Sequence, residues 1–439
     1  MKGIMIAAPN SGSGKTIITA ALLRAFLIKG YNVCAFKTGP DFIDTAFLKA
    51  ASKKPAGNLD MHLQGRTGIK KAIGMGEGEY CIIEGVMGYF DGIYNTFENS
   101  SYDISRELNI NSILVYSPEA EMFSAVPKLK GMAEFKDSNI KGVILNKVSK
   151  EYYEMLKPKI EEYTDLKVLG YVPNIRDMDI ESRHLGLIQS SEINDIDKRI
   201  EIAAEIISEF VNINLIINLM KDIESIPIEY PKRKNIRAAV AMDKAFSFYY
   251  RENLKLLQEC CTVEYFSPLK DKHLPKCDFI YIGGGYPEVF KKELSKNKEI
   301  LADIKDFAER GGLIYAECGG FMYLTESIEG SKMAGILNGS STMTKQLQNF
   351  GYADIELKEN CLLGRTGNKI TAQEFHKSVT NVSGDTIYYI KGTGSKRNWS
   401  CGYSYKNVLA GYAHINFIGN MDSFKYMLNY IEENISKDL

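Results

Sequence analysis

The stretch GLIYAECGGFMYL, residues 312–324, has the layout of a strand, a sharp turn and a helix. Its first apolar run ends at Cys318, two glycines follow, and a second apolar run comes after them. A reactive side chain at the tip of such a turn is called a nucleophile elbow. Glycines let the backbone turn tightly there, and a helix that starts after the thiol favours the thiolate. The stretch predicts an α/β fold in which Cys318 is either a nucleophile or a buried structural cysteine.

Two other stretches favour the nucleophile. YIGGGYPE, residues 281–288, follows an apolar run and offers the backbone N–H groups of Gly284 and Gly285 to an oxyanion, together with that of Gly319. GYAHINF, residues 411–417, supplies His414. A histidine in an apolar run can also be a core residue whose hydrogen bonds are satisfied within the protein. A cysteine and a distant histidine are the minimum for thiol catalysis. We therefore predict Cys318 as the nucleophile and His414 as the proton carrier.

The N-terminus carries a second motif, IMIAAPNSGSGKT, residues 4–16. A strand is expected at residues 4–8 and a helix at residues 17–29, with Gly30 just beyond its end. A glycine-rich loop between a strand and a helix is a P-loop, although Pro9 stands where the pattern has its first glycine. The predicted ATP-binding residues are Gly12, Ser13, Gly14, Lys15 and Thr16. Lys15 is expected to reach the β- and γ-phosphates and Thr16 to ligate Mg²⁺.

Acidic residues follow two of the next predicted strands. One strand, at residues 32–36, runs into KTGPDFID, residues 37–44, and another, at residues 80–84, ends in Glu84. Open α/β sheets bind ligands at the carboxyl ends of their strands, so Glu84 is a predicted Mg²⁺ ligand. Gly-Pro-Asp is also ordinary turn chemistry, and Asp91 fits either a substrate contact or a turn.

The order of elements predicts two domains. Strands at residues 112–116, 141–145 and 168–171 alternate with helices such as 119–134, which indicates a parallel, doubly wound sheet. Asn146 lies at a strand end. It either forms hydrogen bonds with the edge of the adenine base or has a capping role. A helical region at residues 192–219 precedes a proline-containing linker at 226–235, which places the domains at 1–235 and 236–439. The second domain is expected to contain strands at 236–242, 263–266 and 279–282, a helix at 295–310, and Ser247 as an N-cap.

Composition narrows the class of protein. The chain has 439 residues, of which 45% are hydrophobic and 25% charged, as in an ordinary soluble protein. A net charge of −1 gives no electrostatic case for nucleic acid or an anionic membrane. No apolar run approaches the roughly 20 residues that span a bilayer. Eight cysteines without a CxxC pair predict reduced thiols rather than a zinc site, so a cytoplasmic location is expected.

Taken together, these segments resemble the cobyrinate a,c-diamide synthase family in order and at matching lengths. The resemblance implies two doubly wound α/β domains, an N-terminal P-loop NTPase similar to dethiobiotin synthetase and a C-terminal class I glutamine amidotransferase domain. It also implies that Lys37, Asp41 and Asp44 belong to the Mg–ATP and carboxylate-substrate site and that Asp91 faces the substrate. The implied Mg²⁺ ligands are Thr16, Asp44 and Glu84. Segments 183–187 (with His184), 343–348 and 374–376 also have family counterparts.

A P-loop domain that phosphorylates a carboxylate, joined to a domain that releases ammonia from glutamine, makes an ATP-dependent amide ligase. The resemblance implies that the substrate is cobyrinate, amidated on its a and c acetates in cobalamin biosynthesis. Relatives that act on hydrogenobyrinate or nickel-sirohydrochlorin remain alternatives, and cobyric acid synthases rank lower. A MinD-like ATP switch would need neither Cys318 nor His414. The order of amidation, the ammonia path and the oligomeric state, a homo-oligomer included, stay open.

Two departures from common patterns are visible. His414 is followed by Ile415 and Asn416, so a His-x-Glu triad is absent and the family resemblance implies a Cys–His pair. Ala372-Gln373 precedes Glu374-Phe375-His376 at a place where Gly-His is expected. The polar stretch at residues 396–399, which holds the single tryptophan, receives no function.

Overall fold

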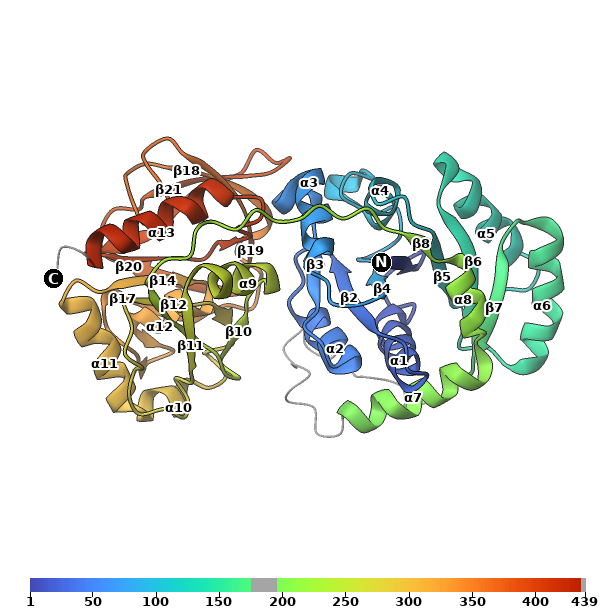
Figure 1. The fold of residues 1–439 in the computed structure, drawn as a ribbon, viewed down its shortest axis with the longest axis horizontal. Coiled ribbons are helices and arrows are strands. Elements are labelled where there is room, and N and C mark those ends of the chain that lie inside the picture. The colour runs from blue at the N-terminus through green and yellow to red at the C-terminus, as the bar shows by residue number, and fades with distance from the viewer. Residues whose placement is uncertain (175–195, 436–439) are drawn as a thin grey trace. The chain divides into compact units, whose positions relative to one another are not determined.

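The computed structural model describes residues 1–174 and 196–435, and it contains two compact units (Figure 1). The first unit comprises Met1–Met61 with Gly65–Ile228, and the second comprises His62–Gln64 with Glu229–Leu439. The predicted boundary at residue 235 stays a prediction. The family-like segment at residues 183–187, with His184, lies outside the described residues.

The first unit is built on one mainly parallel sheet. Its strands are β1 (Lys2–Ala7), β2 (Val33–Thr38), β3 (Gly57–Leu59), β4 (Tyr80–Glu84), β5 (Ser112–Tyr116), β6 (Ile140–Asn146), β7 (Lys167–Val172) and β8 (Lys221–Asp222). The order is β3-β2-β4-β1-β5-β6-β7, all parallel, and β8 pairs antiparallel with β1. Every residue of β2 and β5 is buried, as expected when both faces of a parallel sheet are covered. The predicted doubly wound sheet is confirmed.

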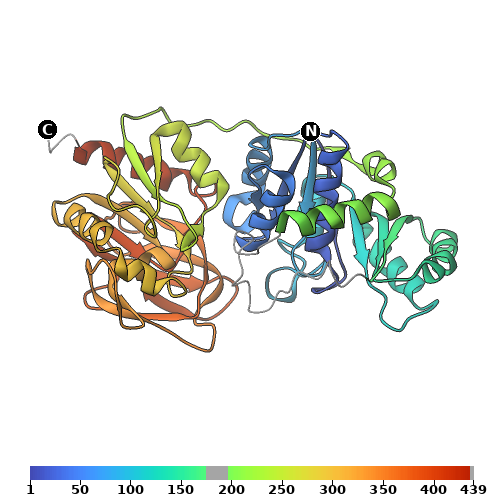
Figure 2. The same cartoon turned by 90° about the horizontal axis from the view of Figure 1, so that it is seen from below.

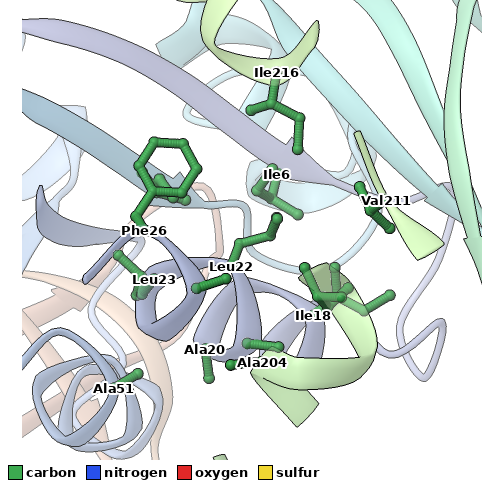
Figure 3. Close-up of a cluster of buried hydrophobic side chains, with 14 of the residues drawn as sticks. Ile6, Ile18, Ala20, Leu22, Leu23, Phe26, Ala51, Ala204, Val211 and Ile216 are labelled. Carbon is green, nitrogen blue, oxygen red and sulfur yellow. The ribbon is translucent and has the colours of Figure 1, made fainter. Parts of the chain in front are cut away.

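Helices connect these strands. They are α1 (Lys15–Ile28), α2 (Ile43–Ser52), α3 (Met61–Gly74), α4 (Ser101–Glu107), α5 (Ala125–Glu134), α6 (Lys150–Tyr163), α7 (Ile196–Phe210) and α8 (Ile213–Leu219). Helix α7 lies along α1, as Figures 1 and 2 show. Ile18, Leu22 and Phe26 recur every four residues on α1, are fully buried and belong to the cluster in Figure 3. Ala20 and Ala204 lie where α1 meets α7, and their small side chains let the two helices approach closely. Packing along α1 therefore holds the helix that follows the P-loop.

Shortening Leu22 tests this packing. Leu22 is 0% exposed, so Leu22→Ala is expected to lower the free energy of unfolding of the first unit by about 2–5 kcal/mol. The measurement is urea unfolding followed by the loss of ATP-analogue binding. Leu215→Ala is the matched control, because Leu215 of α8 is 38% exposed and should change stability by less than about 1 kcal/mol. Equal effects of the two variants would contradict this account of the core.

The helical region predicted at residues 192–219 is interrupted. Helix α7 ends at Phe210, and α8 begins at Ile213, where the Asn212 side chain accepts a hydrogen bond from the Leu215 amide. Asparagine is a strong N-cap, so it starts a new helix in an otherwise apolar and periodic segment. None of the helices in the described ranges combines the length and the hydropathy that a membrane crossing requires.

The second unit contains another mainly parallel sheet, which confirms a second α/β domain. Its strands, in spatial order, are β11 (Thr262–Phe266), β9 (Arg237–Ala241), β12 (Phe279–Ile282), β14 (Leu313–Glu317), β24 (Val408–Gly411) and β23 (Tyr403–Tyr405), of which only β23 is antiparallel to its neighbour. Its helices are α9 (Arg251–Cys260), α10 (Lys291–Lys296), α11 (Lys298–Glu309), α12 (Gly319–Leu324) and α13 (Met421–Ile435). The helix predicted at residues 295–310 is α11, separated from α10 at Asn297.

Two further sheets, one mixed and one antiparallel, lie between α12 and the C-terminal helix and were not predicted from the sequence. One contains β15 (Thr325–Ile328), β16 (Ser331–Lys332), β17 (Leu337–Met343) and β20 (Ser378–Val382). The other contains β18 (Phe350–Leu357), β19 (Lys369–Phe375), β21 (Tyr388–Gly392), β22 (Asn398–Cys401) and β25 (His414–Ile415). Part of the unexplained stretch at 396–399 is thus strand β22, in which Trp399 pairs with Ile390. A further correction is Ser247, which lies in β10 (Phe246–Phe248) and caps no helix, because α9 starts at Arg251.

Candidate functional site

The P-loop joins β1 to α1 at the centre of the first sheet. Gly12 and Gly14 take φ angles of 82° and 89°, a region that favours glycine. A Cβ on Gly14 would lie 2.5 Å from the Asn146 side-chain nitrogen, which donates to the Ser13 carbonyl at 2.9 Å. Asn146 therefore supports the loop in this structure, and its role at the adenine edge stays a prediction.

The side chain of Lys15 is buried beside the P-loop rather than exposed to solvent. Its Nζ donates to the carbonyl oxygens of Met87 at 2.6 Å and Asn10 at 3.2 Å. Burial, reinforced by the nearby positive charge of Lys37, lowers the pKa of Lys15 to about 8. A phosphate group that arrives here would favour the charged form and replace the carbonyl partners.

The adjacent strands β2 and β4 bring Lys37 and Glu84 together, since these residues are register partners. Lys37 Nζ lies 2.8 Å from Glu84 Oε1 and 2.6 Å from Asp44 Oδ2, and Thr16 Oγ1 donates to Glu84 Oε1 at 2.6 Å. Burial raises the pKa of Glu84 despite the Lys37 charge. Burial also acts to lower the pKa of Lys37, but Asp44 and Glu84 outweigh it and raise this pKa above its usual range. The structure thus gathers three predicted residues beside Thr16.

Mg²⁺ would fit the oxygen atoms of Thr16 and Glu84. Glu84 is 0% exposed, and its Oε2 has no hydrogen-bond partner among the described residues. The described ranges hold no cluster of three acidic, histidine or cysteine side chains suited to a metal, but Mg²⁺ usually takes only one or two carboxylates together with phosphates. Asp44 pairs with Lys37 here, so its role as a Mg²⁺ ligand stays a prediction.

Asp41 and Asp91 both make local turn contacts. Asp41 Oδ1 accepts from the amides of Ile43 at 2.7 Å and Asp44 at 3.0 Å, where α2 begins. Burial and the Asp44 charge raise the pKa of Asp41. Asp91 Oδ2 accepts from the Gly88 amide at 2.9 Å. These contacts match the turn interpretation of both segments, and the substrate roles of Asp41 and Asp91 stay predictions.

The lowered pKa of Lys15 gives a pH prediction. Above about pH 8 free Lys15 is neutral, so ATP must bind together with a proton, and its affinity should fall by up to about tenfold for each further pH unit. Calorimetric titration with a non-hydrolysable ATP analogue between about pH 8 and 9.5 measures this. Lys15→Arg, which keeps its charge, should show a flat profile. A flat profile in the unaltered protein would contradict the prediction.

In the second unit, β14 ends at the predicted elbow. Cys318 has φ 49° and ψ −104°, a strained backbone for a residue with a side chain. Its amide donates to the Gly411 carbonyl at 2.7 Å, and the Gly320 amide donates to the Gly283 carbonyl at 3.0 Å. A Cβ on Gly320 would lie 2.3 Å from the Ile282 oxygen. Only glycine fits this close approach, so the strand–turn–helix expectation is confirmed in detail.

The predicted oxyanion glycines and His414 surround this elbow. A Cβ on Gly319 would lie 3.0 Å from the Gly285 nitrogen, so these two glycines are adjacent. A Cβ on Gly284 would lie 2.5 Å from His414 Cε1 and 3.2 Å from Nε2. The structure therefore brings Gly284, Gly285, Gly319 and His414 together beside Cys318. Their chemical roles stay predictions.

The start of the helix acts on the Cys318 thiol in the expected direction, but other effects outweigh it. Burial and the negative charge of Glu288 raise the pKa of Cys318 well above its usual range, although the Gly319 amide acts to lower it. Helix α12 has only 6 residues, and its positive end does not offset the loss of solvation. A neutral thiol needs a base that removes its proton as it attacks.

Each half of the chain is similar to a known domain family. A model of the CobQ/CobB/MinD/ParA nucleotide binding domain matches residues 4–188, and one of the CobB/CobQ-like glutamine amidotransferase domain matches residues 237–421. The MinD cell division protein of Aquifex aeolicus is similar in structure over 52% of this chain and 100% of its own, at 16% identity and a TM-score of 0.31.

Two curated relatives span the full length. The cobyrinate a,c-diamide synthase of Clostridium acetobutylicum is 47% identical, over 98% of this chain and 100% of its own. The protein of the same name from Clostridium tetani is 44% identical with the same coverage. This chain belongs to the cobyrinate a,c-diamide synthase family. It is accordingly an enzyme of the glutamine-hydrolysing ligase class, with a nucleotide-binding half and an amidotransferase half.

The structure of this cobyrinate a,c-diamide synthase family member also shows a residue that sequence reasoning missed. Glu317 directly precedes Cys318 and is 1% exposed, and its Oε2 lies 3.6 Å from His414 Nδ1. The absent His-x-Glu pattern concerns the residues after His414, so it gives no indication of Glu317. Glu317 ends an otherwise apolar strand, and this pattern could have indicated it from the sequence. Buried carboxylates are rare without a partner, so an acidic residue in such a place suggests one.

The family-like segment at 374–376 forms a second buried pair. His376 Nδ1 lies 2.8 Å from the Ser378 carbonyl, and His376 Nε2 lies 3.5 Å from Glu374 Oε2. The His376 ring stacks on Tyr412 with centroids 3.6 Å apart. Tyr412 precedes His414 by two residues, so this pair supports the segment that carries the predicted base.

Proposed function

We propose that this enzyme amidates the a and c acetate carboxylates of cobyrinate, in cobalamin biosynthesis, with ATP and with ammonia taken from glutamine at Cys318. The observation that carries the proposal is the elbow, where a strained Cys318 precedes Gly319. Gly319 lies against Gly285, the neighbouring Gly284 lies against His414, and the same chain has a P-loop. The full-length relatives named cobyrinate a,c-diamide synthase support the choice of substrate.

In the amidotransferase unit, Cys318 Sγ attacks the side-chain amide carbon of glutamine while His414 Nε2 takes the thiol proton. The oxygen that becomes negative is held by the amides of Gly285 and Gly319. His414 then gives its proton to the leaving nitrogen, ammonia departs, and a thioester remains. Water hydrolyses the thioester to glutamate and restores the thiol. The raised pKa of Cys318 supports this proton transfer during attack, since a neutral thiol is the starting form.

In the nucleotide-binding unit, a substrate carboxylate oxygen attacks the γ-phosphorus of ATP, and ADP leaves. Lys15 and the P-loop amides hold the phosphates, and Lys37 orients the reacting groups together with Asp44. Ammonia then attacks the acyl phosphate carbon and phosphate leaves, which forms the amide. Thr16 and Glu84 would hold Mg²⁺, which neutralises phosphate charge when bound. Asp41 and Asp91 are proposed substrate contacts, and Asn146 is a proposed adenine contact.

The test incubates the enzyme with Mg–ATP, glutamine and either cobyrinate, hydrogenobyrinate or nickel-sirohydrochlorin, and follows ADP, glutamate and product mass. A gain of two amides on cobyrinate is the expected result. Turnover restricted to another tetrapyrrole would keep the chemistry and replace the substrate. ATP hydrolysis without an amide on any of the three would overturn the proposal and favour a MinD-like switch.

A further inference from the structure

The side-chain carboxylate of Glu317 accepts hydrogen bonds on both of its oxygens, in addition to the backbone pairing of its strand. Its Oε1 accepts hydrogen bonds from the Tyr315 hydroxyl at 2.8 Å and the Ile415 amide at 3.2 Å, and its Oε2 accepts from the Tyr281 hydroxyl at 2.9 Å. These three donors fix both carboxylate oxygens. Burial and the Glu317 charge raise the pKa of Tyr281 and of Tyr315 well above the usual range, so both phenols stay protonated donors.

The sheet explains why this carboxylate reaches His414. Tyr315 and Glu317 are two residues apart on β14 and share a face, and Tyr281 of β12 is the register partner of Tyr315. Glu317 is the register partner of Gly411, the last residue of β24. The chain needs only three further residues to reach His414, and the Ile415 amide that binds Glu317 comes directly after the histidine. The strand that ends in the nucleophile thus also carries the carboxylate next to the base.

The two nitrogens of His414 have different surroundings. Nδ1 faces Glu317 Oε2 at 3.6 Å, whereas Nε2 lies on the side of the Gly284 loop. A carboxylate only accepts hydrogen bonds, so it selects the form with a proton on Nδ1 and the lone pair on Nε2. The distance between His414 Nδ1 and Glu317 Oε2 is longer than an ordinary hydrogen bond. Such long contacts are common at catalytic sites before substrate binds.

We infer that Glu317 positions His414 and holds its proton on Nδ1, so that the site is a triad whose carboxylate comes from the residue before the nucleophile. This inference rests on the proposed glutamine chemistry. Glu317 acts through His414 and is a positioning residue. It replaces the acidic residue that a His-x-Glu pattern would supply, a place occupied here by Asn416.

A charge effect on the thiol predicts the opposite result from a positioning role. The negative charges of Glu288, Glu374 and Glu317 all act to raise the pKa of Cys318. If Glu317 acted only through this charge, then Glu317→Gln would ease loss of the thiol proton and speed glutamine hydrolysis. If Glu317 positions His414, then Glu317→Gln slows hydrolysis, because the new amide can donate to Nδ1 and select the wrong histidine form.

The experiment compares Glu317→Gln with the unaltered protein. We expect kcat for glutamine hydrolysis to fall about 10²-fold or more, with the KM for glutamine changed less than about threefold. Amidation driven by free ammonia should be retained. Nitrogen NMR of histidine-labelled protein, with His414 assigned through His414→Asn, should show its proton move away from Nδ1. Unchanged kcat and an unchanged His414 signal would overturn the inference.

A second pair of variants covers the case in which Glu317→Gln does not fold. Tyr281→Phe and Tyr315→Phe, combined, remove two donors to Glu317 and are expected to lower glutamine hydrolysis about tenfold. Tyr323→Phe is the matched control, because the Tyr323 hydroxyl is buried without a hydrogen-bond partner among the described residues. Full activity in the double variant would contradict the inference. If the unaltered protein shows no glutamine hydrolysis that depends on Cys318, the proposed function fails instead.

Discussion

Cys318→Ala is expected to abolish amidation with glutamine and to leave amidation with free ammonia close to that of the unaltered protein. The loss should be about 10³-fold or more, because no other group at the elbow can form the thioester. The ammonia-driven reaction should remain, because the P-loop site lies in the other compact unit. Glutamate release and product mass, measured with each nitrogen source, give both results.

Cys361→Ala is the control for Cys318→Ala. Cys361 is also a buried free cysteine of the second unit, but it lies in a turn between β18 and β19 rather than at the elbow. Its loss should leave both nitrogen sources usable. If Cys318→Ala kept glutamine-dependent amidation, the assignment of the nucleophile would be wrong.

Lys15→Met is expected to give the opposite result from Cys318→Ala, with amidation lost and glutamine hydrolysis retained. Loss of this ammonium group should lower amidation with either nitrogen source about 10²–10³-fold, because one charge that stabilises the transferring phosphoryl group is removed. Glutamine hydrolysis should continue at Cys318, measured as glutamate release without ATP consumption. Methionine keeps the apolar stem, which matters because Lys15 is only 8% exposed.

Lys29→Met provides the comparison for Lys15→Met, since Lys29 lies at the opposite end of α1 and is exposed. It should leave ATP use and amidation unchanged. If Lys15→Met retained full amidation, the phosphate site would have to be placed elsewhere. If it lost glutamine hydrolysis as well, the two chemistries would depend on each other more than the two-unit structure suggests.

Structure can be predicted best from the sequence where the backbone geometry allows only a few residue types. A P-loop and an elbow each require glycine at fixed offsets between a strand and a helix, so the placing of Gly14 and Gly320 could be anticipated. Parallel strands buried on both faces are also plain in sequence, because they read as continuous apolar runs.

Other features depend on contacts between distant segments. The strands after α12 are partly exposed, and β18 alternates buried and exposed residues only over its second half. The Lys37–Glu84 contact arises from strand register, which no local motif encodes. Cys318 illustrates a competition of effects, because the helix end alone suggests a thiolate, whereas burial, known only from the folded structure, decides the direction of the pKa shift.

The strand pairing of His414 has a consequence for how the second unit becomes active. Cys318 follows a strand of the parallel sheet, whereas Gln373 of β19 pairs with His414 in an antiparallel sheet. Residues 408–415 pass from one sheet to the other, since β24 belongs to the first and β25 to the second. We therefore expect glutamine hydrolysis to require both sheets to be complete and correctly paired. We expect its onset during synthesis of the chain to be a late event, so that a half-folded domain releases no ammonia.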